Sequence, residues 1–232
     1  MTRPLDLLVF GAHPDDAEIG MGGTIAKQVE AGHRVGICDL TFAEMSSNGT
    51  VEIRKKEAEE AAKVLGLSVR ANLGLPDRGL QLVKEQLDEI TLAIRRYRPR
   101  VVFCPYWEDR HPDHVKCSHM VQEAVFSAKL RNYLPETKPH QVEQLYFYFI
   151  NDAYEADVMV DITAQFSKKK AALMAYRSQF ESVDPSRGQV ATPLNQGYLD
   201  NVEARDRLLG QKRLVPYAEG FVSKLPLIVN LF

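Results

Sequence analysis

Short continuous hydrophobic runs alternate along the chain with longer segments in which apolar residues recur at helical spacing. The runs are predicted to be strands at 5–11, 34–41, 69–73, 100–104, 145–150, 157–162 and 215–222. The amphipathic segments are predicted to be helices at 17–31, 52–65, 85–96, 113–130, 163–176 and 201–211. This alternation predicts an α/β fold, in which a Rossmann-like, mostly parallel sheet carries helices on both faces as a three-layer sandwich.

The segments between these elements are polar and carry several turn residues. Loops are predicted at 42–51, 75–79, 105–112 and 182–197, and the last is expected to lie beside a site. Thr163 is expected to cap the helix that follows it. Gly20, Gly22 and Gly23 fall inside the first predicted helix, where each costs about 1 kcal/mol relative to alanine. We expect close packing of this helix on the sheet to compensate.

Composition narrows the class of protein without identifying it. The 232 residues suit a single domain spanning 1–232, and 45% hydrophobic with 26% charged residues is typical of globular proteins. A net charge of -2 with mixed signs gives no support to a nucleic-acid or membrane partner. The lysine run at 168–170 is expected to form the solvated face of a helix. Three widely spaced cysteines make a disulfide framework unlikely and favour a cytoplasmic protein, and Cys38 and Cys104, in predicted strands, are interpreted as buried thiols.

Two similar tetrads follow the first and fourth predicted strands. They read His-Pro-Asp-Asp at 13–16 and His-Pro-Asp-His at 111–114. Sites in open α/β sheets form outside the carboxyl ends of the strands, where neighbouring connections diverge. We therefore expect the two tetrads to face one crevice, although nearly 100 positions separate them.

The tetrads supply the side chains that a catalytic metal site needs. Two imidazoles, one carboxylate and a water are a usual zinc set, and a second carboxylate can take a proton from that water, whose pKa zinc lowers to about 7. Another imidazole can stabilise an oxyanion or protonate a leaving amine. The available residues are His13, Asp15, Asp16, His111, Asp113 and His114. This set suits hydrolysis of an amide or ester.

Other interpretations of these residues stay open at this point. A single His-Pro-Asp is most often a turn, and only the pairing of two tetrads makes a site the better explanation. A Rossmann-like module that binds a nucleotide without hydrolysis is a remote alternative. It is disfavoured because the glycines do not form Gly-x-Gly-x-x-Gly and the adjacent carboxylates would repel a pyrophosphate. His33, His119 and His140 are interpreted as turn, structural or surface residues.

At the two tetrads the chain resembles the PIG-L/LmbE-like family of zinc-dependent de-N-acetylases. The resemblance rests on Ala-His-Pro-Asp-Asp at 12–16 and His-Pro-Asp-His at 111–114, and it runs from Leu5 through 177–180. It implies His13, Asp16 and His114 as zinc ligands, although Fe²⁺ could replace zinc in such a site. It further implies Asp15 as the general base and His111 as the oxyanion-stabilising or acid residue.

The resemblance also suggests a substrate. The loop at 46–50 looks like the branch that removes acetate from N-acetylglucosaminyl (GlcNAc) malate in bacillithiol biosynthesis, and members of that branch are often hexamers. Arg54 matches a family arginine that holds substrate, whereas by itself it would be an ordinary exposed helix residue. Tyr198 is matched to a tyrosine that reaches the scissile carbonyl.

One departure weakens the assignment of the substrate. Many family members have Arg-Gly before the Glu of the loop after the second strand, where this chain has Phe-Ala-Glu at 42–44. The same family includes amidases of thiol S-conjugates and deacetylases of chitin oligosaccharides or phosphatidylinositol-linked sugars. The chain has no apolar run long enough to span a bilayer, which counts against the lipid-linked substrate.

Overall fold

The computed structural model describes residues 3–183, 186 and 188–226. Its strands are β1 (Leu7–Gly11), β2 (Val35–Thr41), β3 (Val69–Leu75), β4 (Val101–Pro105), β5 (Gln144–Tyr148), β6 (Val158–Asp161) and β7 (Ala218–Val222). Its helices are α1 (Asp16–Glu30), α2 (Val51–Leu65), α3 (Lys84–Tyr97), α4 (Pro112–Ala128), α5 (Phe166–Met174), α6 (Arg177–Phe180) and α7 (Tyr198–Gln211), with a short 3₁₀ helix, η2 (Pro193–Asn195).

The strands form one seven-stranded sheet in the order β3-β2-β1-β4-β5-β7-β6. The five strands from β3 to β5 are parallel, whereas β7 runs antiparallel to both of its neighbours. The chain leaves β1 towards β2 and β3 on one side and then returns to β4 on the other. The carboxyl ends of β1 and β4 therefore flank the point where strand order reverses, which is where α/β sheets form their sites.

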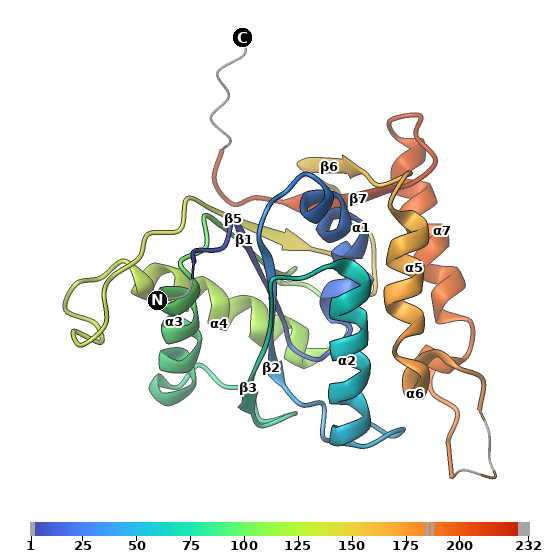
Figure 1. Cartoon of the computed structure of the whole chain (residues 1–232), viewed down its shortest axis with the longest axis horizontal. Coiled ribbons are helices and arrows are strands. Elements are labelled where there is room, and N and C mark those ends of the chain that lie inside the picture. Colours follow the sequence, from blue (N-terminus) through green and yellow to red (C-terminus); the bar gives the residue numbers. More distant parts are fainter. Residues whose placement is uncertain (1–2, 184–185, 187, 227–232) are drawn as a thin grey trace.

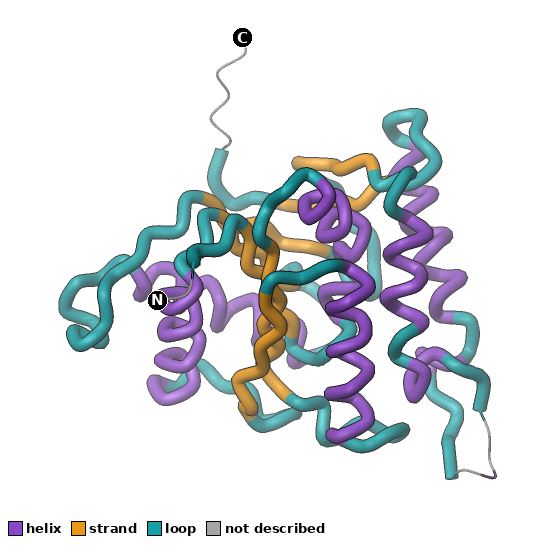
Figure 2. Tube along the Cα trace, in the orientation of Figure 1, coloured by secondary structure: helices purple, strands orange, loops and turns teal. Residues whose placement is uncertain are grey.

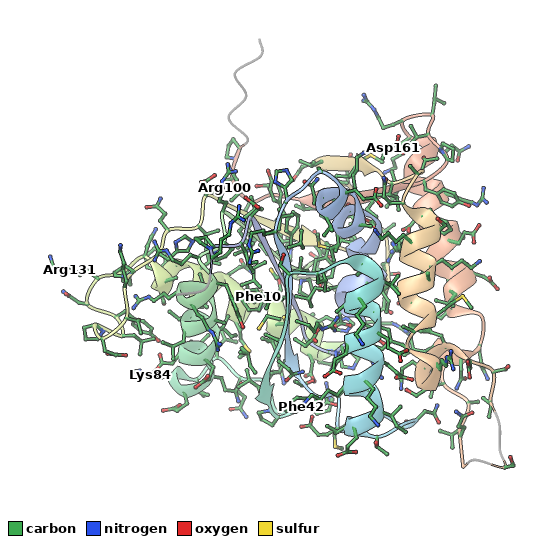
Figure 3. The ribbon with its side chains drawn as sticks, viewed as in Figure 1. Phe10, Phe42, Lys84, Arg100, Arg131 and Asp161 are labelled. Carbon is green, nitrogen blue, oxygen red and sulfur yellow. The ribbon has the colours of Figure 1, made fainter. Side chains whose placement is uncertain are left out.

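Helices cover both faces of this sheet, with α3 and α4 on one face and α1, α2, α5 and α7 on the other (Figures 1 and 2). Alternate residues of β1 enter the two cores: Leu7 and Val9 pack in one, and Leu8 and Phe10 in the other. Figure 3 shows Phe10 inside the molecule, between the two helical layers. The predicted three-layer α/β sandwich is confirmed.

The glycines of α1 bring that helix into direct contact with its neighbours. A Cβ at Gly20 would lie 2.1 Å from Tyr148 Cδ2 on β5, and one at Gly23 would lie 2.6 Å from Ile162 Cδ1. Both separations are shorter than any real contact, so only glycine fits at these two positions. Close packing thus offsets the helix-weakening effect of these residues, as predicted.

Several predicted boundaries near the C-terminus are wrong. Thr163 does not cap α5, since its N–H and its hydroxyl both donate to Asp161 Oδ1 and the helix begins three residues later. The helix predicted at 201–211 starts earlier, at Tyr198, directly after Gly197 with φ of +79°. The strand predicted from residue 215 begins at Ala218. Residues 184, 185 and 187 of the predicted loop lie outside the described residues.

The lysine run at 168–170 does not form a uniformly solvated face, and this prediction is wrong for Lys169. Its side chain is 0% exposed, and Nζ donates to Asp206 Oδ2 on α7 at 2.6 Å and to Glu219 Oε1 on β7 at 2.7 Å. Glu219 in turn accepts the N–H groups of Gly23 and Thr24. This buried cluster ties α5, α7, β7 and α1 together.

Candidate active site

A cavity of about 610 Å³ opens at the carboxyl ends of β1 and β4. The loops after β2 and β3, the segment before α7, and both tetrads contribute to its wall. All seven residues that the sequence predicted for the site line it: His13, Asp15, Asp16, Arg54, His111, His114 and Tyr198. The predicted convergence of two sequence-distant tetrads on one crevice is therefore observed.

Asp16 is the meeting point of the two tetrads. Its Oδ1 lies 3.1 Å from His114 Nε2, and its Oδ2 lies 3.5 Å from His13 Nδ1. Oδ2 also accepts the backbone N–H of His13 at 2.8 Å, which fixes the carboxylate against the turn that carries it. All three side chains are buried, so their orientations are set by protein contacts and not by solvent.

Burial and ion pairing shift the pKa values of these groups in opposite directions. Burial alone would lower the pKa of His114, but the nearby carboxylates of Asp16 and Asp109 raise it to about 9. Burial likewise opposes a charged His13, whose pKa the surrounding carboxylates hold well above its ordinary value. Burial also opposes ionisation of Asp16, yet His114 holds the pKa of this carboxyl well below its usual range. A cation bound here would have to displace the imidazole protons.

Asp15 lies beside His13, Asp16 and His114 in a backbone conformation that residues other than glycine rarely adopt. Its φ is +117°, which for a residue other than glycine costs on the order of 1–3 kcal/mol. Two contacts of Arg54 oppose this strain: Nη2 donates to Asp15 Oδ2 at 2.7 Å, and Nε and Nη2 both donate to the Pro14 carbonyl. Burial raises the pKa of Asp15 to about 7, although the Arg54 charge acts against it.

Arg54 is not the exposed helix residue that its position alone suggested. It is 5% exposed, and its guanidinium carbon lies 5.6 Å from the centre of the Tyr176 ring. The side chain lines the cavity and holds Asp15 in place there. Its predicted role in binding substrate stays a prediction.

His111 and Tyr198 complete the predicted set. The Asp113 N–H donates to His111 Nδ1 at 3.2 Å, so the proton of a neutral His111 ring lies on Nε2. Burial and the neighbouring His114 and His13 lower the pKa of His111. The Tyr198 hydroxyl donates to Asn151 Oδ1 at 3.0 Å, which places the ring at the cavity wall. Contact of Tyr198 with a substrate carbonyl stays a prediction.

Sequence reasoning missed several residues that the structure brings to the cavity or to its histidines. They are Asp77, Arg78, Asp109, Arg110 and Asn151. Four of them lie in the two predicted loops that follow β3 and β4. A rule that treats every polar residue in the loops after the parallel strands as a candidate would have included these four.

The donor set fits a divalent transition metal. Ligand atoms of His13, His111 and His114 all lie within 4.8 Å of one another, and the same holds for His13, Asp77 and Asp113. Imidazoles with carboxylates suit zinc and, equally, Fe²⁺ in a site of two histidines and one carboxylate. Both groups contain His13, but neither is the predicted ligand set of His13, Asp16 and His114, which stays a prediction.

Comparison with known proteins agrees with this description. Residues 8–125 match the model of the family described as PIG-L, GlcNAc-PI de-N-acetylase. The structure of the conserved protein TT1542 from Thermus thermophilus superposes with a TM-score of 0.89 at 44% identity, covering 97% of each chain.

Several curated relatives carry functional names. Diacetylchitobiose deacetylase of Thermococcus kodakarensis is 31% identical over 75% of this chain and 70% of its own length. A probable N-acetyl-alpha-D-glucosaminyl L-malate deacetylase 2 of Bacillus cereus is 29% identical over 76% and 84%. The 4-oxalmesaconate hydratase of Pseudomonas putida is 28% identical over 99% and 93%.

The chain belongs to the PIG-L family of de-N-acetylases. The sequence-based predictions of this family, of the α/β fold and of an amidohydrolase-type enzyme are confirmed at that level. No helix among residues 3–183, 186 and 188–226 is long and apolar enough to cross a membrane. The three cysteines form no disulfide, as expected, and Cys38 and Cys104 are buried as predicted, as is Cys117.

Proposed function

We propose that this protein is a zinc-dependent hydrolase that removes acetate from the N-acetyl group of a small GlcNAc conjugate. One observation carries the proposal: His13, Asp16 and His114 converge in a cavity beside Asp15, a carboxylate outside that set. A ligand group with a separate base is the arrangement that amide hydrolysis needs. His13, Asp16 and His114 would hold the cation.

Each residue of the site then has a distinct role in the proposed hydrolysis. A cation held at this place would polarise the amide carbonyl and lower the pKa of water. Asp15 takes the proton of the attacking water, and Arg54 holds Asp15 in its strained conformation. His111 carries its ring proton on Nε2 when neutral, so it can donate to the developing oxyanion or, when charged, protonate the leaving amine.

Two arginines at the cavity favour an acidic substrate. Arg78 and Arg110 both line the cavity and are exposed, while Arg78 also donates to Asp113 at 3.2 Å. Guanidinium groups suit carboxylates, which they bind in a planar, two-point geometry. Among the candidate substrates, GlcNAc-malate carries carboxylates next to the sugar. We therefore favour GlcNAc-malate, and a place in bacillithiol synthesis, over chitin oligosaccharides and thiol S-conjugates.

A substrate panel tests this preference. We expect acetate release from GlcNAc-malate with a higher kcat/KM than from free GlcNAc, diacetylchitobiose or an N-acetylated thiol conjugate. Arg110→Gln should raise the KM for GlcNAc-malate about tenfold, since a hydrogen bond to a charged group is lost, and leave free GlcNAc unaffected. Arg131→Gln, at the periphery in Figure 3, is the matched control. Equal kcat/KM values for GlcNAc-malate and for the neutral substrates would contradict the preference.

The Pseudomonas putida relative motivates a second candidate function, hydration of a carbon–carbon double bond. That relative is named 4-oxalmesaconate hydratase and aligns with nearly the whole chain. Its substrate is also acidic, so the two cavity arginines suit either reaction. Adding 4-oxalmesaconate to the panel separates the two, because hydration consumes it without releasing acetate or an amine.

Two further predictions stay open. Cytoplasmic location is proposed from the cysteine pattern, and assembly into a homo-oligomer, including a hexamer, is proposed from the family resemblance. The nucleotide-binding alternative loses support, because Gly20 and Gly23 are in contact with Tyr148 and Ile162.

A further inference from the structure

Both histidines that flank Asp16 have a carboxylate partner at each ring nitrogen. His13 directs Nδ1 towards Asp16 and places Nε2 at 3.2 Å from Asp77 Oδ1. His114 is turned the other way, with Nε2 towards Asp16 and Nδ1 at 3.0 Å from Asp109 Oδ1. The two rings therefore face Asp16 through chemically different nitrogen atoms.

The two outer carboxylates are themselves held in place. Asp77 Oδ2 accepts the Met45 N–H at 2.9 Å, and the Asp77 N–H donates to Glu44 Oε1. The side chain of Asp77 is 5% exposed. Asp77 comes from the loop after β3, so its position is set independently of the turn that carries His13.

Asp109 is fixed in a comparable way by the loop after β4. Its Oδ1 accepts the His111 N–H at 2.7 Å and the Asn151 amide at 2.8 Å. The Asp109 side chain is also 5% exposed. An ionised carboxylate can only accept hydrogen bonds. Asp77 and Asp109 therefore each keep an imidazole N–H directed towards them once a cation takes the place of the protons that face Asp16.

We propose that Asp77 and Asp109 are positioning residues that fix opposite tautomers of the two histidines. His13 then carries its proton on Nε2 and His114 on Nδ1, which leaves His13 Nδ1 and His114 Nε2 to bind the cation with Asp16. This inference rests on the metal site of the proposed function. Metal-binding histidines generally donate their second N–H to a carboxylate or carbonyl, and the loss of that partner weakens metal binding.

An arrangement in which Asp77 is itself a ligand is geometrically conceivable, because His13, Asp77 and Asp113 lie close together. The hydrogen bonds disfavour it. Both oxygens of Asp113 already accept N–H groups of Arg78, and Asp113 Oδ2 is 3.8 Å from His13 Nε2. Asp77 Oδ2 is likewise occupied by the Met45 N–H.

Zinc affinity tests the proposal without any substrate. Competition with a chromophoric chelator should show that Asp77→Ala and Asp109→Ala each weaken zinc binding about 10- to 100-fold. The corresponding Asn variants should lie between Ala and wild type, because an amide oxygen still accepts the N–H. If Asp77 were itself a zinc ligand, Asp77→Asn would lose as much zinc affinity as Asp77→Ala. Asp6→Ala is the matched control, since Asp6 lies 3.8 Å from His33 outside the cavity.

The tautomers can be measured directly in the wild-type protein. Long-range ¹H–¹⁵N spectra of the zinc-loaded form should show His13 protonated at Nε2 and His114 at Nδ1. Zinc on His13 Nε2, the same tautomer in both rings, or alanine variants with wild-type affinity would overturn the proposal while leaving the hydrolase assignment intact. A wild-type protein that binds no zinc would overturn both. Because the spectra are recorded on the wild-type protein, they test the proposed tautomers even if a variant fails to fold.

Discussion

Asp15→Asn is expected to slow acetate release by about 100- to 10,000-fold, the range typical for loss of a general base, while zinc stays bound. Asp15 lines the cavity beside Asp16 but takes no part in the two contacts that join Asp16 to the histidines. Asparagine matches the shape of aspartate and, like aspartate, is enriched at positive φ, so we expect it to keep the backbone at +117°. Initial rates and the zinc content of the purified variant are the measurements.

A matched carboxylate-to-amide change separates this effect from general damage. Glu143 pairs with Arg100 near the start of β5, at the end of the sheet opposite the cavity, and its side chain is 57% exposed. Glu143→Gln should therefore keep the wild-type rate. Near wild-type hydrolysis by Asp15→Asn would show that another group takes the proton from water.

Lys169→Met should lower the free energy of unfolding by about 3–5 kcal/mol, because it removes the cation that two buried carboxylates share. Asp206 keeps the guanidinium of Arg205, whereas Glu219 is left with the backbone N–H groups of Gly23 and Thr24. The side chains of Lys169, Asp206 and Glu219 are all 0% exposed. Urea denaturation followed by circular dichroism gives the change in free energy.

Lys168→Met provides the comparison within the same lysine run. Lys168 Nζ lies 3.3 Å from Glu30 Oε1 near the surface, where an ion pair contributes at most about 1 kcal/mol. A Lys169→Met protein no less stable than Lys168→Met would mean that Asp206 and Glu219 find other partners or lose their charge.

The fold was predictable because the central strands are buried on both faces. Every residue of β1 and β2 is buried, and such strands read as continuous apolar runs in the sequence. The two tetrads could be placed together for a topological reason, since strand ends that flank the switch point share one crevice. The sequence of the two tetrads, His13 to Asp16 and His111 to His114, thus predicted the chemistry of the site, and their places after the strands predicted where it lies.

What could not be predicted depends on contacts between distant segments. Nothing local distinguishes Lys169 from Lys168; only α7 and β7 packing over α5 determine which lysine is buried. In the sequence, Asp77 and Asp109 are ordinary loop carboxylates; only the tertiary structure places them beside the imidazole rings of His13 and His114. Thr163 has a side chain that commonly caps helices, but its hydroxyl and its N–H donate to Asp161 instead.

Acetate release by the metal-stripped protein tests the central claim most directly. The protein is treated with a chelator, freed of the chelator, and assayed on GlcNAc-malate before and after addition of one equivalent of zinc. We expect no acetate above background from the stripped protein and recovery of the rate with zinc. Undiminished acetate release from protein shown by elemental analysis to hold no metal would contradict the assignment of His13, Asp16 and His114 as a catalytic metal site.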